Sequence, residues 1–187
     1  HRDLHSFPTR RSSDLLIGWG GILGLLLLPA VAMQFTTEVN WTGGDFLFAF
    51  LMLGSVGLAV ELTVRANPAW SYRAGMGIVL AACFLTVWIN LAVGIVGNED
   101  NPINALFFLV PLTAIAGSVL GGFRARFMAV AAAAAAAAQL GVMLYISATG
   151  QGFPIGVTLF FGALWLVAAA LFRSEEHTSE LQSRAYL

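Results

Sequence analysis

Charge is what the middle of this sequence lacks most. Charged residues make up 10% of the whole chain, against about a quarter of an average soluble domain. Residues 16–172 contain no lysine and no histidine, and Cys83 is the only cysteine, so no intrachain disulfide can form. The charges in this range are few: Arg65, Arg73, Arg124 and Arg126, with Glu38, Asp45, Glu61, Glu99 and Asp100.

These absences exclude most of the chemistry used by enzymes and nucleic-acid-binding proteins. Few side chains remain that could act as a nucleophile, a general base or a metal ligand. The sequence also has no glycine-rich phosphate-binding loop and no basic patch for nucleic acid. We therefore expect a protein without evident catalytic apparatus, with no cofactor, no metal site and no nucleic-acid partner.

Long apolar stretches are what the sequence has instead. The chain is 58% hydrophobic, with a mean hydropathy of +0.81. A membrane-spanning helix needs about 20 mainly apolar residues. Six stretches come close, which predicts an all-α, polytopic membrane helix bundle with short loops in a single domain over residues 16–172: 16–35, 46–64, 74–96, 103–123, 127–148 and 154–172.

The fifth stretch is the weakest of the six. Its consecutive alanines at residues 131–138 give little driving force for insertion into lipid. A face of alanines suits close packing against neighbouring helices better than contact with lipid. Whether this segment spans fully decides the topology of the chain after Arg126.

The two ends differ from the middle in being polar and without apolar periodicity. Residues 1–14, HRDLHSFPTRRSSD, and residues 173–183, RSEEHTSELQS, resemble translated sequencing-library adapters. We therefore expect 1–15 and 173–187 to be non-native tails; the alternative is a pair of natural polar tails. The remaining range, 16–172, lacks an initiator methionine, as a fragment would.

Arginine in the loops predicts the orientation of the bundle. Arg65 and Arg73 lie between the second and third stretches, and Arg124 and Arg126 lie between the fourth and fifth. The other loops contain no basic residue, and two of them hold the acids Glu38, Asp45, Glu99 and Asp100. The positive-inside rule places the two arginine loops in the cytoplasm, and with six spans both termini are then cytoplasmic as well.

Three polar residues inside the predicted spans are candidate functional groups. Glu61 is the only acid within a span, and an intramembrane carboxylate is a candidate proton or cation site. The alternative is a helical ion pair with Arg65, four residues later. Asn90 and Gln139 either line a polar path or hydrogen-bond across a helix interface.

The turn that contains Glu99 and Asp100 is a second candidate site. Its carboxylate and amide oxygens suit a hard cation such as calcium, but the calcium-loop spacing and its closing glutamate are absent. The alternative is helix capping, with Asn101 as the N-cap and Pro102 at the first helical position.

Small-residue pairs at helix-contact spacing predict close packing within the chain or between copies in a homo-oligomer. These are Gly20 with Gly24, Gly117 with Gly121, and Ser118 with Gly122. In addition, Pro111 should kink the fourth span.

One segment carries a resemblance to a known family. Residues 90–102, NLAVGIVGNEDNP, are similar to a stretch in a family of small uncharacterised bacterial inner-membrane proteins, where it reads much like NLAVGIIGSEDNPAN. Residues 16–20 and 39–42 also resemble that family. The resemblance implies a helical fold in the bacterial inner membrane, in contact with the lipid bilayer, but no reaction. We expect a non-enzymatic integral membrane protein; the alternative is a transporter or channel subunit for a small solute or ion.

Overall fold

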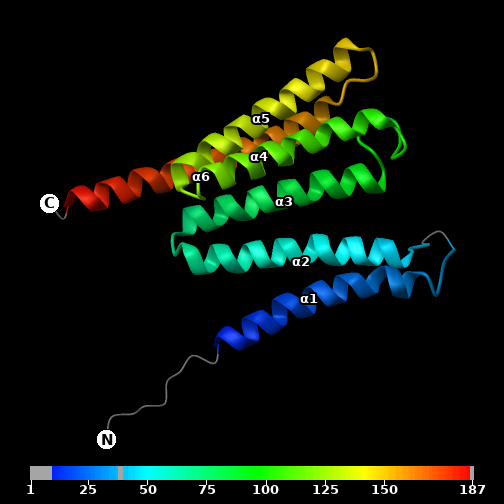
Figure 1. Ribbon diagram of the computed structural model, residues 1–187, viewed down its shortest axis with the longest axis horizontal. Coiled ribbons are helices and arrows are strands. Elements are labelled where there is room, and N and C mark those ends of the chain that lie inside the picture. The colour runs from blue at the N-terminus through cyan, green and yellow to red at the C-terminus, as the bar shows by residue number, and fades with distance from the viewer. Residues whose placement is uncertain (1–9, 38–39, 186–187) are drawn as a thin grey trace, which may run out of the picture. The chain divides into compact units, whose positions relative to one another are not determined.

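The computed structural model describes residues 10–37 and 40–185, and every regular element among them is helical (Figure 1). This confirms the all-α prediction. The elements are α1 (Arg10–Ala32), α2 (Gly43–Ala66), α3 (Trp70–Ala92), the 3-10 helix η1 (Pro102–Phe108), α4 (Leu109–Leu120), α5 (Ala125–Ala148) and α6 (Ile155–Ala185). They fall into two compact units, His1–Glu61 and Leu62–Leu187, which are described in turn.

Five helical segments in the described residues are long and apolar enough to cross a membrane. They are Gly43–Ala66, Trp70–Ala92, Pro102–Leu120, Ala125–Ala148 and Ile155–Thr178, and they include the alanine-rich segment. Large apolar side chains such as Leu120 and Leu159 are 88% and 66% exposed, as lipid-facing residues are. These features indicate a multi-pass membrane protein. The described apolar part of α1, Trp19–Ala32, is shorter, so the span at 16–35 stays a prediction.

The third predicted span lies four residues too far along the chain, because α3 occupies Trp70–Ala92 and not 74–96. The helix stops at Val93 because Gly94 and Gly97 have φ of +74° and +76°, a left-handed conformation that cannot continue a right-handed helix. Arg73, expected in the loop, therefore lies in the first turn of α3.

The fourth predicted span, 103–123, is not one α-helix. It begins as η1 and becomes α4 at Leu109, and it ends at Leu120 because Gly122 and Phe123 have positive φ. Pro111 lies in the first turn of α4 and has no N–H to donate to the carbonyl of Phe107, so the winding changes just before it. The structure thus shows a change from 3-10 to α winding near Pro111, and the kink expected there stays a prediction.

The two end helices extend into the segments predicted to be non-native tails. Helix α1 begins at Arg10, and α6 continues past Phe172 to Ala185. Extending an existing helix needs no new nucleation, and glutamate, glutamine, leucine and arginine are good helix formers. The helical state of these polar residues therefore does not bear on their origin.

In the first unit, α1 and α2 approach each other at Ile22 and Gly57. A Cβ atom added to Gly57 would lie 2.8 Å from Cδ1 of Ile22. The start of α2 is capped by Thr42 and Asp45: Asp45 accepts hydrogen bonds from the backbone N–H and hydroxyl of Thr42, and Thr42 Oγ1 accepts one from the N–H of Asp45. This reciprocal cap satisfies backbone donors at the helix end.

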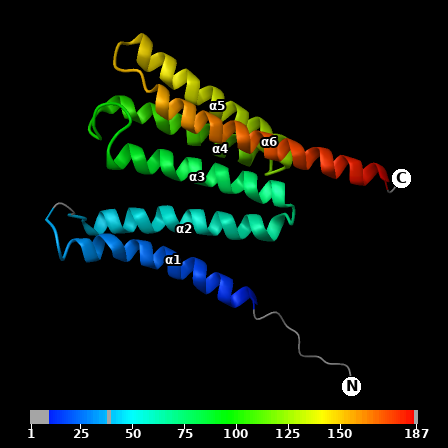
Figure 2. The ribbon, with the colours of Figure 1, turned by 180° about the vertical axis from the view of Figure 1, so that it is seen from behind.

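In the second unit, α5 packs against α6 and α4, and α3 packs against α6 (Figures 1 and 2). The core is formed by large side chains that are fully or almost fully buried, among them Phe107, Ile146, Phe161, Trp165 and Phe172. The alanine-rich helix faces this core, with Ala129, Ala131, Ala132 and Ala135 buried. The prediction that the alanines pack against neighbouring helices is confirmed.

Gly117 and Gly121 serve this internal packing. A Cβ added to Gly117 would lie 2.7 Å from Cβ of Ala131 on α5, and one added to Gly121 would lie still closer to Cβ of Phe127. This pair therefore brings two helices of the same chain together. Around Gly20 and Gly24 a Cβ would meet nothing within 4 Å, so their role between copies stays a prediction.

We expect Gly117→Ala to destabilise the second unit by roughly 1–3 kcal/mol, because the added methyl overlaps Ala131. Thermal unfolding in detergent measures the change. Gly141→Ala on α5 is the matched control, since its Cβ meets nothing within 4 Å and alanine favours the helix by roughly 0.5–1 kcal/mol. Equal melting temperatures for the two variants would contradict the packing described.

Candidate functional site

The turn between α3 and η1 is held by one buried side chain, Asn104. Its Oδ1 accepts hydrogen bonds from the backbone N–H groups of Ile95 and Val96, at 3.0 and 2.8 Å. Its Nδ2 donates to the carbonyls of Val96 and Asn98, at 3.3 and 2.7 Å. A Cβ on Gly94 would lie within 2.7 Å of this amide, so only glycine fits there. Asn104 thus replaces the backbone partners that an irregular segment lacks.

Helix capping also accounts for the polar residues of this turn. Asn101 is the N-cap of η1, and its Oδ1 accepts a hydrogen bond from the N–H of Ile103 at 3.2 Å. Pro102 follows at the first helical position, as the capping interpretation predicts. Glu99 and Asp100 are exposed at the tip. Among the described residues, no group of three or more His, Cys, Asp or Glu side chains could hold a metal ion.

Sequence reasoning missed the role of Asn104. The available signal was an asparagine in an otherwise apolar run two residues after a helix-starting proline. Its partners lie eight and nine residues back along the chain, across a turn whose path the sequence does not define.

The opposite end of the second unit carries its arginines. Arg73 donates to the carbonyls of Asn67 and Val64, both at 2.7 Å, and so caps the end of α2. Tyr72 donates its hydroxyl proton to the carbonyl of Phe123 at 2.6 Å, which ties the start of α3 to the turn between α4 and α5. The helix ends and turns that carry Arg65, Arg73, Arg124 and Arg126 therefore lie at one end of the unit, which we call the arginine end.

The other end of this unit, which we call the acidic end, holds Glu99 and Asp100 and has no basic residue in its loops. The turn after α3 lies beside the loop after α5, because a Cβ on Gly152 would be 3.4 Å from Cγ1 of Val96. Two contacts at the arginine end involve the predicted non-native tail: Glu175 accepts from Ser71 at 2.7 Å, and Glu176 lies 4.0 Å from Arg126. These two contacts are not assigned to the protein's own site.

Asn90 and Gln139 are buried in the second unit, with 3% and 0% of their surface exposed. Asn90 Nδ2 donates to the carbonyl of Thr86 in its own helix at 2.9 Å, while its Oδ1 has no hydrogen-bond partner. Both polar atoms of the Gln139 side chain lack a partner. The structure therefore shows neither amide in the predicted hydrogen bond across a helix interface.

Two further buried residues have polar side-chain atoms without a hydrogen-bond partner. They were not among the candidates taken from the sequence. Thr158 Oγ1 and Trp165 Nε1, both on α6, have no hydrogen-bond partner and lie on residues that are 6% and 0% exposed. Their signal is weak, since threonine and tryptophan are ordinary residues of membrane helices. Only the three-dimensional contacts distinguish them.

Glu61 belongs to a different unit from these residues. It is partly buried on α2 and ends the first unit, whereas Asn90 and Gln139 belong to the second. The structure thus brings the two amides into one bundle and does not group Glu61 with them. Its ion pair with Arg65 stays a prediction.

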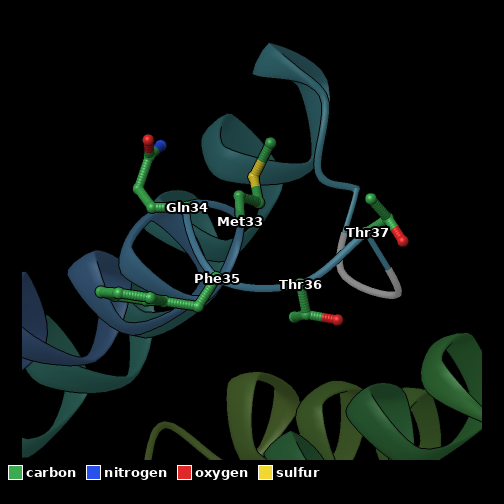
Figure 3. A pocket seen from close by; sticks show the side chains of 5 residues that line it. All are labelled: Met33, Gln34, Phe35, Thr36 and Thr37. Atoms are coloured by element: carbon green, nitrogen blue, oxygen red, sulfur yellow. The ribbon is translucent and has the colours of Figure 1, made fainter.

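Two surface hollows among the described residues have few polar groups that could bind a ligand together. One, of about 430 Å³, lies after α1, and Figure 3 shows that its side chains point in different directions; they are Met33, Gln34, Phe35, Thr36 and Thr37. The other, of about 530 Å³, is an apolar groove between α4 and α5 beside Gly117 and Phe127. In neither hollow do polar side chains point toward a common position.

Comparison with known proteins found no family model, no curated protein and no solved structure that matches the chain. Function must therefore be argued from the residues of the second unit.

We expect Asn104→Ala to destabilise the protein by about 2–3 kcal/mol, because it leaves buried backbone N–H and C=O groups without partners. Thermal unfolding in detergent measures the loss. The exposed Asn98 provides the control, since Asn98→Ala keeps the backbone carbonyl that Asn104 binds. A melting temperature for Asn104→Ala equal to that of the control would show that the turn does not depend on this side chain.

Proposed function

We propose that the protein is a non-enzymatic integral protein of the bacterial inner membrane, with its arginine end and both termini in the cytoplasm. The separation of charge along the second unit carries this proposal. Four arginines lie at one end of the bundle and the acids Glu99 and Asp100 lie at the other. Basic loops are retained on the cytoplasmic side of bacterial membranes.

An exposed tryptophan at the arginine end supports a membrane boundary there. Trp70 is 78% exposed at the first residue of α3. Tryptophan and tyrosine favour the interface between lipid and water, where the ring is apolar and its N–H or O–H is solvated. The start of α3 is therefore suited to the level of the lipid headgroups.

Reporter fusions test the orientation. We expect alkaline phosphatase inserted at Asn98 to be active, because that turn would be periplasmic, and the same reporter inserted at Asn67 to be inactive. A fluorescent reporter that folds only in the cytoplasm should give the reverse pattern. Phosphatase activity at Asn67 but not at Asn98 would invert the proposed topology, and purification of residues 16–172 without detergent would exclude the membrane itself.

A second candidate function is a transporter or channel subunit for a small solute. The observation that favours it is the set of buried polar atoms without a partner on Asn90 and Gln139. Unsatisfied polar groups are costly in a medium without water, so intramembrane polar residues are retained mainly where they bind or conduct something.

Solute flux into proteoliposomes tests this second candidate. We expect Asn90→Leu to reduce flux strongly, because it removes the unpartnered Oδ1, while Asn98→Leu at the exposed turn leaves flux unchanged. Correct folding of both variants is checked by their melting temperatures. Flux equal to that of protein-free vesicles for the unmodified chain would exclude the candidate.

A further inference from the structure

Five buried polar atoms among the described residues of the second unit have no hydrogen-bond partner. They are Asn90 Oδ1, Gln139 Oε1 and Nε2, Thr158 Oγ1 and Trp165 Nε1. Buried polar groups in proteins almost always have a partner, so each exception requires a physical explanation. Here they occur on the buried faces of α3, α5 and α6, which pack together around α6.

The depths of these residues can be compared along the helices, which rise about 1.5 Å per residue. Helices α3 and α6 run in opposite directions (Figure 1), and Gly75 faces the ring of Phe172. Asn90 follows Gly75 by about 22 Å of helix, and Thr158 precedes Phe172 by about 21 Å. Asn90 and Thr158 therefore lie at nearly the same depth, close to the acidic end.

Gln139 and Trp165 form a second pair, deeper in the bundle. Gln139 precedes the end of α5 at Ala148 by about 14 Å, and Trp165 follows the start of α6 at Ile155 by about 15 Å. Because α5 and α6 are packed antiparallel neighbours, these two residues also share a depth. Half of a hydrocarbon core of about 30 Å is about 15 Å, so this pair lies near the middle of the membrane.

Among the described residues, the arginine half of the bundle has no such atoms. The buried hydroxyl groups there have partners within the chain: Tyr72 donates to Phe123, and Ser118 donates to Ala114. Thr63 is also buried there, and most of the other buried side chains at this level, including Met76, Val79 and Phe172, are apolar. The polar pairs thus extend from the acidic end to the middle of the membrane and stop there.

The chemistry of the two pairs selects the kind of molecule that could satisfy them. Trp165 can only donate, Asn90 Oδ1 can only accept, and Gln139 and Thr158 can do both. Residues 74–96, 103–123 and 127–172 contain no Asp, Glu, Lys, Arg or His. An ion at this depth would therefore have no compensating charge, whereas a neutral molecule with donors and acceptors would have partners.

We propose that Asn90, Thr158, Gln139 and Trp165 form an internal binding site for a small uncharged solute that both donates and accepts hydrogen bonds. The site reaches from the acidic end to the middle of the membrane, and apolar packing closes it toward the arginine end. This inference rests on the membrane location proposed above. It deepens the transporter candidate by assigning two more residues to the site and by excluding ions as its ligand.

Hydrogen exchange at the Trp165 indole, with water as the probe, tests the site in the full chain in lipid nanodiscs. We expect the Nε1 proton to exchange readily although the residue is 0% exposed, because water enters the site from the acidic end. The resonance is assigned by its loss in Trp165→Phe, and the indole of the 78% exposed Trp70 is the fast reference. Protection equal to that of the backbone amides around Trp165 would overturn the proposal.

Gln139→Leu separates a binding role from a structural one. The substitution keeps a side chain of similar size and removes both unpartnered atoms, so exchange at Trp165 should slow about tenfold or more. The melting temperature should not fall, because Gln139 has no protein hydrogen bond to lose; a clear fall would identify it as a structural residue. Gln151→Leu, in the exposed loop after α5, is the matched control and should leave exchange unchanged.

Flux measurements distinguish an organic solute, water and ions as the ligand of the site. They also allow the proposed site to be tested separately from the proposed membrane location. Urea or glycerol entry into proteoliposomes that falls in Gln139→Leu would support an organic solute, and water entry alone would support water as the ligand. Potassium flux that depends on Gln139 would overturn the restriction to uncharged molecules. The reporter fusions in cells show independently whether the chain is inserted, so a protected Trp165 in a chain that inserts refutes the site and not the membrane location.

Discussion

The structure depends on one constraint, which is that polar groups surrounded by lipid must find their partners within the protein. Helices meet this constraint for the backbone, and every regular element in the described residues is a helix. Where the backbone leaves the helix after Ala92, the side chain of Asn104 supplies hydrogen bonds to backbone groups that are buried in the protein. Where α2 ends, Arg73 binds its last carbonyls in the same way.

The features that could be predicted from the sequence are those that depend on local composition. Apolar length predicted the helical spans, and Asn101 with Pro102 predicted the cap of η1. The limits of α3 were wrong because they depend on backbone conformation at Gly94 and Gly97, and a glycine does not reveal which conformation it adopts. The sequence analysis missed Asn104, Thr158 and Trp165 because the role of each depends on which atoms surround its side chain. The distance between residues along the sequence does not reveal those neighbours.

The alanine-rich helix shows how weak insertion and strong packing can belong to the same segment. Alanine gains little from contact with lipid, but its small side chain lets neighbouring backbones approach, as Ala131 and Gly117 do. Helix α5 accordingly contacts both α4 and α6 and contributes several buried alanines to the core. Its place in the membrane is stabilised by its neighbours, and the large exposed side chains of α4 and α6, such as Leu120 and Leu159, face the lipid instead.

The distribution of polar groups gives the bundle a direction. On the arginine side, the hydroxyl groups of Tyr72 and Ser118 are satisfied by carbonyls of the chain, so nothing in that half calls for a further polar molecule. On the acidic side, Asn90, Thr158, Gln139 and Trp165 present atoms that the chain leaves unsatisfied. A uniform structural bundle has no reason to concentrate this cost in one half. The proposed binding site for an uncharged solute would account for this cost, because the solute or water would supply the missing partners in that half while the apolar packing between Trp165 and Phe172 closes the other.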